Sequence, residues 1–263
     1  MPGTNTSTRT ALVTGASRGI GAVIARQLAG RGVRVALHYR NNRAAAEAVL
    51  KDLPGRGHAL FAADLGDAGD TQRLWTEASN QLGQIDLLVN NAGLFVDHPP
   101  LTTDLAAWQA AWQLILNTNL VGPANLCLLA AQSMSTRREA LDGAFGRGRI
   151  VNISSRGAFR GEPDSPAYGA SKAGLNSLSQ SLAKALAPRQ IFVYCIAPGW
   201  VETDMATGHL QGPQGADILA QHPLGRVARP EEIAQATVFC GLDAPAAMSG
   251  GVIDVNGASY LRT

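Results

Sequence analysis

The chain has 263 residues, of which 46% are hydrophobic and 16% charged, and its formal net charge is +2. This length and apolar content suit one large α/β domain or two small ones. A charge so close to neutral argues against nucleic acid or a membrane surface as a partner, and no apolar run reaches the 18 or so residues that span a bilayer. We therefore expect a cytoplasmic protein with a flexible, polar N-terminus over residues 1–9.

Apolar runs that predict strands alternate with helical patterns along the chain. Strands are predicted at 10–13, 33–39, 58–62, 85–89, 149–153, 191–196 and 252–255, and helices at 20–29, 44–53, 69–82, 105–135, 166–187 and 231–241. Strands this apolar, separated by helices, indicate a sheet covered on both faces. The prediction is an α/β fold: a single Rossmann-type, doubly wound domain over residues 10–263, with a seven-stranded, mostly parallel sheet and helices on both faces.

Two segments interrupt this alternation. Residues 137–149 are polar and rich in glycine, and predict a surface loop. Residues 202–229 carry several glycines and prolines between the sixth strand and the next helix. A long irregular segment at the carboxyl end of a strand is where a lid over a ligand would lie.

The three cysteines and five histidines do not form a metal-binding pattern. The cysteines are far apart and odd in number, which favours buried thiols over disulfides. No two histidines have the spacing of a zinc site, so we expect no metal.

A glycine-rich turn follows the first predicted strand, in Thr14-Gly-Ala-Ser-Arg-Gly-Ile-Gly21. Glycine at positions 15, 19 and 21 permits a tight turn, close approach of a phosphate, and packing of helix on strand. The N-terminus of the following helix can then hold a pyrophosphate. The alternative is a plain turn between a strand and a helix, but its place in the first turn of an α/β chain favours a nucleotide site.

The second strand ends at Tyr39-Arg40 without the acidic residue that would bind the ribose 2′-hydroxyl of NAD. Arg18 lies in the glycine turn. Two guanidinium groups beside the ribose would favour a 2′-phosphate, so NADP(H) is the preferred cofactor and NAD(H) the alternative.

Tyr168 and Lys172 lie four residues apart in a segment that Pro166 and a Ser165 cap would start as a helix. This spacing puts the phenol and the ammonium on one face. The ammonium would lower the pKa of the tyrosine, which could then act as a general acid or base. A surface pair with no function has the same spacing.

Together with further motifs, these features resemble the classical branch of the short-chain dehydrogenase/reductase family over roughly residues 9–260. The additional motifs are Asp64-Leu65 after strand three, Asn90-Asn91-Ala92-Gly93 closing strand four, Asn119 in the long helix, Ser155 thirteen residues before Tyr168, and Pro198-Gly199 leading to Val201 and Thr203.

The resemblance implies hydride transfer between a nicotinamide cofactor and a carbonyl or alcohol carbon. It assigns catalytic roles to Asn119 as part of a proton relay, Ser155 as holder of the carbonyl oxygen, Tyr168 as acid or base, and Lys172. The residues that it implies for cofactor binding are Gly15, Ser17, Arg18, Gly19, Ile20, Gly21, Tyr39, Arg40, Asp64, Leu65, Asn91, Ala92, Gly93, Tyr168, Lys172, Pro198, Gly199, Val201 and Thr203.

Within the family the chain is similar to 3-oxoacyl-acyl-carrier-protein reductases, in Gly199–Met205 and Asp254–Gly257. Those segments recur in reductases of other substrates. Arg137, Arg138 and Arg189 could contact an acidic carrier protein or could simply be solvated, and residues 139–146 look like an insertion. Arg156 and Arg160 could contact an anion in a mostly apolar substrate pocket.

Two further readings stay open from the sequence, a non-catalytic NADP(H)-binding regulatory protein and a sugar-nucleotide epimerase or dehydratase. The latter would need a longer C-terminal region. The resemblance also implies a homotetramer or homodimer, packed through helices 105–135 and 166–187.

Overall fold

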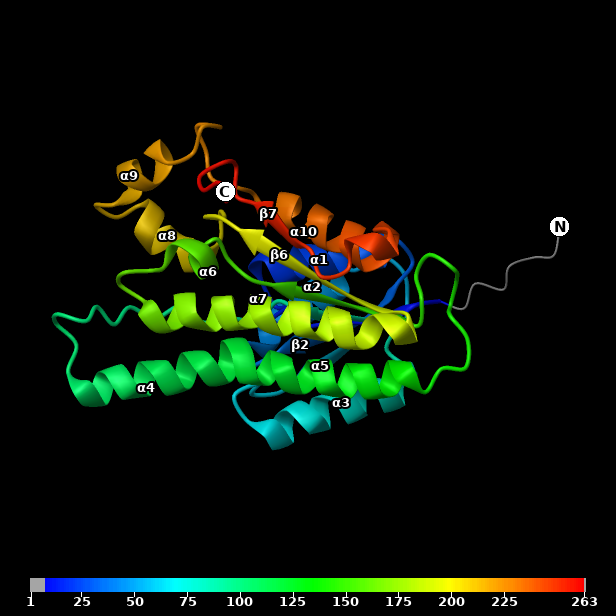
Figure 1. Ribbon diagram of the computed structural model, residues 1–263. Coiled ribbons are helices and arrows are strands. Elements are labelled where there is room, and N and C mark those ends of the chain that lie inside the picture. Colours follow the sequence, from blue (N-terminus) through cyan, green and yellow to red (C-terminus); the bar gives the residue numbers. More distant parts are fainter. Residues whose placement is uncertain (1–7, 263) are drawn as a thin grey trace.

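The computed structural model describes residues 8–262, and their central feature is a seven-stranded sheet (Figure 1). Every neighbouring pair of strands is parallel, in the order β3-β2-β1-β4-β5-β6-β7. The strands are β1 (Thr10–Val13), β2 (Arg34–Tyr39), β3 (Ala59–Ala62), β4 (Leu87–Asn90), β5 (Gly148–Ile153), β6 (Ile191–Pro198) and β7 (Val252–Val255). The predicted seven-stranded, doubly wound α/β fold is confirmed, and the sheet is entirely parallel.

Helices cover both faces of this sheet, as Figure 1 shows. Successive residues of β1 explain why: Ala11 and Val13 enter one apolar core, whereas Leu12 enters the other. The first core is closed by α1 (Gly19–Gly30), α2 (Arg43–Lys51) and α10 (Pro230–Val238), and the second by α3 (Ala68–Leu82), α5 (Gly122–Ser135) and α7 (Pro166–Leu186).

The strand order reverses direction at β1, which lies between β2 and β4. In open parallel sheets, ligands bind at the carboxyl ends of the strands where such a reversal opens a crevice. The short helices α6 (Gly157–Arg160), α8 (Asp204–Leu210) and α9 (Gly215–Ala220) gather at the end of the sheet toward which the β6 arrow points in Figure 1. The last two belong to the segment that we expect to act as a lid.

The helix expected over residues 105–135 is continuous but not regular. It consists of α4 (Leu105–Leu116), a π-helical turn (Asn117–Val121) and α5. By length and composition it could cross a bilayer. An 18-residue stretch of the helix has a mean hydropathy of 1.5, and 44% of that stretch is buried. A single such helix is weak evidence for a membrane, because the core helix of a soluble protein passes the same test. Here α5 packs on β4, β5 and α7.

The segment expected as a polar surface loop, residues 137–149, is exposed over most of residues 138–144, but both of its ends are anchored in the protein. Arg137 forms an ion pair with Asp86 in which both side chains are almost inaccessible, and Arg149 is fully buried. The Arg149 guanidinium donates to the carbonyls of Ala144, Phe145 and Cys240. Of the expected N-terminal tail, residues 1–7 lie outside the described part, while Arg9 pairs with Asp142 of this segment.

Candidate active site

A cavity of about 470 Å³ opens at the carboxyl ends of the strands, beside the reversal of strand order. Most residues that the sequence predicts for catalysis or cofactor binding line it: Gly15, Ser17, Arg18, Gly19, Ile20, Arg40, Asp64, Leu65, Asn91, Ala92, Gly93, Ser155, Tyr168, Lys172, Pro198, Gly199, Val201 and Thr203. The other three, Gly21, Tyr39 and Asn119, do not line it.

The glycine turn is shaped by close packing against the end of β4. Gly15 has a φ of +64°, and a Cβ there would lie 2.9 Å from the Cα of Ala92. A Cβ at Gly21 would overlap the carbonyl oxygen of Gly15, so the absence of a side chain at Gly21 lets α1 pack closely against the turn. No side chain caps α1, which begins at Gly19. Its first N–H groups and the open turn fit the pyrophosphate of a dinucleotide.

His38 holds this turn against the sheet, a role for which the sequence offers no local signal. The residue is buried, and its Nδ1 accepts a hydrogen bond from the Gly15 N–H at 3.1 Å. Its Nε2 lies 3.0 Å from the carbonyl oxygen of Ala63, to which it therefore donates. Burial lowers the pKa of His38 to about 4, so the ring is neutral at pH 7.

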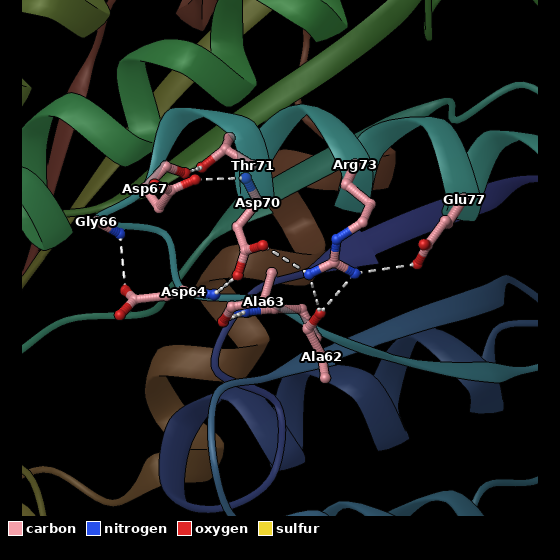
Figure 2. Close-up of polar contacts among 10 residues, drawn as sticks. Ala62, Ala63, Asp64, Gly66, Asp67, Asp70, Thr71, Arg73 and Glu77 are labelled. Carbon is pink, nitrogen blue, oxygen red and sulfur yellow. Dashed lines mark hydrogen bonds and ion pairs between the residues drawn. The ribbon is translucent and has the colours of Figure 1, made fainter.

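Asp64 is held by the loop between β3 and α3, shown in Figure 2. Its backbone N–H donates to the Asp70 carboxylate at 2.9 Å, and its own carboxylate accepts from the Gly66 N–H at 2.9 Å. Arg73 in turn binds Asp70 at 2.8 Å and the carbonyl of Ala62. The Asp64 side chain is thus presented at the cavity by a network between this loop and the start of α3.

The two arginines expected near a 2′-phosphate already have carboxylate partners. Arg40 forms an ion pair with Asp64 at 2.8 Å, and Arg18 lies 3.6 Å from Asp204. All four side chains are substantially exposed, so neither pair is a strong constraint in water. Both guanidinium groups can therefore exchange these partners for a phosphate at little cost.

Two adjacent serines at the end of β5 have different partners. The Ser155 hydroxyl accepts from the Gly157 N–H at 3.0 Å. The Ser154 hydroxyl donates to the backbone carbonyl of Lys172 at 3.2 Å and so ties β5 to α7. Ser155 also interacts with Tyr168, and its hydrogen bond lowers the pKa of the phenol.

Tyr168 and Lys172 both face the cavity from α7, but their electrostatics differ from the expectation. The Lys172 ammonium donates to the carbonyl of Ile153 at 2.8 Å and lies 5.7 Å from the centroid of the Tyr168 ring. Burial raises the pKa of Tyr168 to about 12; the bond with Ser155 opposes this rise and the charge of Glu162 adds to it. Burial likewise lowers the pKa of Lys172 to about 8.

The predicted depression of the tyrosine pKa is thus wrong for this structure. The reason is that desolvation of the phenolate outweighs an ammonium that is itself buried and directed at a carbonyl. Ser165 also departs from its predicted role. Although Pro166 begins α7 as expected, the Ser165 hydroxyl does not cap the helix and instead donates to the carbonyl of Val96 at 2.8 Å.

Asn119 occupies the π-helical turn and closes the cavity from behind. It is fully buried, its Oδ1 accepts from the Leu94 N–H at 2.8 Å, and its Nδ2 donates to the Leu94 carbonyl at 2.9 Å. Its Nδ2 also lies 3.3 Å from the Ser171 hydroxyl. Asn119 therefore joins the loop after β4 to α7, next to Gly93, whose added Cβ would lie 3.5 Å from the Lys172 Nζ.

Aromatic side chains that the motifs do not reveal surround the tyrosine. The Phe95 ring packs edge-on against Tyr168 at 4.9 Å between centroids and against His209 at 5.6 Å. His209 of α8 in turn lies 5.3 Å from Trp200. These contacts connect the segment 202–229 to the wall of the cavity.

Reductases are among the known proteins with similar sequences. A family model described as enoyl-(acyl carrier protein) reductase matches residues 15–258. The chain is 36% identical to the 3-oxoacyl-acyl-carrier-protein reductase FabG of Staphylococcus aureus over 256 residues, which cover 97% of this chain and 99% of that protein. It is also 36% identical to FabG of Escherichia coli over 251 residues, which cover 95% of this chain and 97% of that protein.

Dehydrogenases are among the solved structures with the same architecture. A dehydrogenase/reductase from Sinorhizobium meliloti matches with a TM-score of 0.84 and 31% identity, over 98% of both chains. A short-chain dehydrogenase/reductase from Brucella melitensis, described as a glucose/ribitol dehydrogenase, matches with a TM-score of 0.84 and 30% identity, over 97% of both chains. From the matched length, the identity and the shared fold it follows that this chain belongs to the short-chain dehydrogenase/reductase family of oxidoreductases.

Proposed function

We propose that the protein is an NADP(H)-dependent oxidoreductase that interconverts a carbonyl and a secondary alcohol. The observation that carries this proposal is that Ser155, Tyr168 and Lys172 line the same cavity as the glycine turn. A dinucleotide on that turn and a substrate beside Tyr168 would share one enclosed space. A non-catalytic NADP(H)-binding protein would have no use for this arrangement, and we do not favour it.

The chemistry divides between the cofactor and the side chains. When bound, NADP(H) would supply or accept the hydride, and its oxidised form would add a positive charge to the site. Tyr168 donates its proton to the oxygen that becomes the hydroxyl, and takes it back in the reverse direction. A pKa of about 12 keeps the phenol protonated at neutral pH, which suits the reductive direction. Ser155 donates to the same oxygen and stabilises its developing negative charge.

Lys172 and Asn119 would serve the proton supply. The buried Lys172 ammonium would bind the nicotinamide ribose and favour ionisation of Tyr168 once the positive ring is present. Asn119, joined to Leu94 and Ser171, would fix the backbone on which a relay to solvent is built. Thr203 and the backbone of Val201 would hold the carboxamide.

The preference for NADP(H) over NAD(H) rests on Arg18 and Arg40. Both line the cavity, and both have exposed, exchangeable carboxylate partners. A phosphate offers them more acceptor oxygens than a ribose hydroxyl does. Asp64, released from Arg40, could then accept a hydrogen bond from the adenine.

For the substrate we propose a 3-oxoacyl thioester or a related ketone, because the relatives named above are acyl-carrier-protein reductases. Binding of a carrier protein cannot use all three expected arginines. Arg137 is committed to Asp86 and its side chain is only 8% exposed. Arg138 and Arg189 remain exposed and could contact an acidic partner.

We also propose a cytoplasmic homo-oligomer, a tetramer or a dimer. The helix from Leu105 to Ser135 exposes Leu105, Leu114, Val121 and Leu128, of which Leu105 is 70% and Leu128 55% accessible. Figure 1 shows this helix and α7 side by side on the outside of the sheet. A second copy packed on them would bury these side chains.

The experiment that tests the proposed function is a screen of NADPH oxidation over acetoacetyl thioesters, simple ketones, quinones and sugars, with NADH in parallel. We expect turnover of at least one carbonyl class, faster with NADPH. NADPH binding without turnover of any carbonyl would favour the non-catalytic alternative.

A further inference from the structure

Two arginines, one of which lines the cavity, converge on one neutral oxygen. Arg156, which directly follows Ser155 and lines the cavity, donates from Nη2 to the Oε1 of Gln221 at 3.1 Å. Arg160, the last residue of α6, donates from Nη1 to the same Oε1, also at 3.1 Å. Gln221 is exposed and belongs to the segment 202–229, directly after α9.

The charge of Arg156 is buried without a carboxylate partner among residues 8–262. The residue is only 2% exposed. Its guanidinium binds neutral oxygens alone, that of Gln221 and the carbonyl of Ser259 at 3.4 Å. Burial lowers its pKa to about 10; the charge of Arg160 adds to this effect and the charge of Glu162 opposes it. An unpaired buried cation is costly, so a site that keeps one has a use for it.

The acidic groups nearby do not neutralise the pair. Glu162 also lines the cavity, but its carboxylate lies 3.7 Å from Arg160, and burial raises its pKa. Asp164 is exposed, where water screens it. Two guanidinium groups against one partly buried carboxylate leave one positive charge beside Ser155.

Two neighbouring polar groups are also buried without a partner in the described chain. The Nε2 of His222 and the hydroxyl of Ser259 make no hydrogen bond, and His222 is only 3% exposed. Arg156 lies near enough to His222 to oppose its protonation, which contributes to a lowered pKa after burial. The Nδ1 of His222 donates to the carbonyl of Ile218 at 2.7 Å, so its neutral Nε2 is an unused acceptor. The Ser259 hydroxyl is therefore the unused donor beside the unused charge.

We propose that Arg156 and Arg160 bind an anionic group of the substrate, with the Gln221 oxygen standing where one oxygen of that anion would lie. This inference rests on the proposed carbonyl reductase function. The anion is a carboxylate when the substrate is a free oxo acid, or a phosphate when it is an oxoacyl thioester on a phosphorylated carrier arm. Binding would displace Gln221 and so couple the anion to the segment that bears α9.

Matched substrate pairs separate the two sources of the anion. Acetoacetate and methyl acetoacetate differ in the carboxylate, while acetoacetyl-CoA and its N-acetylcysteamine thioester differ in the phosphates. We expect kcat/KM for the anionic member of one pair to exceed that of its neutral partner by roughly tenfold or more. Preference in the first pair identifies a carboxylate, and preference in the second a phosphate.

The variant Arg160→Gln should reduce the ratio of kcat/KM for the anionic substrate to that for its neutral partner to nearly one. Its matched control is Arg56→Gln. Arg56 is exposed, lies outside the cavity lining, and its replacement removes the same charge. Arg160 is the better target because its side chain is 30% exposed, whereas loss of the buried Arg156 could prevent folding. Equal preference in Arg160→Gln and Arg56→Gln would overturn the proposal.

A second variant tests the site without turnover. Gln221→Glu places a fixed carboxylate between the two arginines, so we expect a higher Tm and loss of the anion preference. Gln211→Glu adds the same charge to the same segment and should change neither. If no carbonyl is reduced, the proposed function fails, but the Tm difference and calorimetric titration with acetoacetate and with CoA still decide the anion site. The proposed anion site would be refuted if Gln221→Glu does not raise the Tm and neither acetoacetate nor CoA binds.

Discussion

The ring of His38 accepts a hydrogen bond from the backbone N–H of Gly15 at 3.1 Å, and so fastens the glycine turn to the second strand. Only the neutral ring can accept at Nδ1 while it donates to Ala63 from Nε2. The folded pKa of about 4 lies below the usual value of 6.5. The unfolded chain therefore binds the proton first as the pH falls.

This relationship predicts a loss of stability on acidification. His38 should contribute its full stabilisation above pH 6.5 and lose it between pH 6.5 and about 4. The difference in pKa corresponds to on the order of 3 kcal/mol. Unfolding free energies from denaturant titrations between pH 4 and 8 measure it. His38→Asn, whose side-chain oxygen can replace Nδ1, should remove this pH dependence of the unfolding free energy, whereas His58→Asn should retain it.

Replacement of Tyr168 by Phe should abolish turnover, by a factor of about 10² or more, because the proton donor is lost. The ring keeps its edge-on contact with Phe95, so the fold and NADPH binding should persist. Steady-state rates and fluorescence titration with NADPH check both. Tyr260→Phe, which removes a hydroxyl outside the cavity lining, is the control. Near-normal turnover in Tyr168→Phe would exclude the assignment of this residue.

The adjacent serines should separate catalysis from stability. Ser155→Ala removes the donor to the reacting oxygen, and we expect kcat to fall by about 10² to 10³. Ser154→Ala loses the bond to the Lys172 carbonyl, and we expect a destabilisation of about 1 kcal/mol with a smaller change in kcat. Rates and thermal melts of the two variants, compared side by side, test this; the reverse ranking in kcat would contradict it.

Arg40 should determine the preference of the enzyme for NADPH over NADH. Arg40→Gln removes a charged donor to the 2′-phosphate, so kcat/KM for NADPH should fall about 10- to 100-fold while that for NADH changes little. Arg43→Gln removes a nearby charge that pairs with Glu47 in α2 and is the matched control. An equal loss with both cofactors would show that Arg40 acts on structure instead of on the phosphate.

The long helix shows where prediction from the sequence succeeds and where it ends. The apolar spacing of residues 105–135 is enough to predict a helix, and the structure has one over that range. The π-helical turn inside it was not predicted. It surrounds Asn119, whose partner Leu94 lies 25 positions away in the chain. A pattern of neighbouring residues cannot predict a contact between residues so far apart in the chain.

The same division runs through the site. Alternating strands and helices and the glycine turn are visible in the sequence, because periodicity and glycine requirements act between near neighbours. Tyr168 and Lys172 are visible through their helical spacing, and Ser155 through the resemblance to the family. The ionisation of Tyr168, the hold of His38 on Gly15, and the convergence of Arg156 and Arg160 on Gln221 come only from the tertiary structure. Desolvation and hydrogen-bond partners depend on groups that folding brings together from distant parts of the chain.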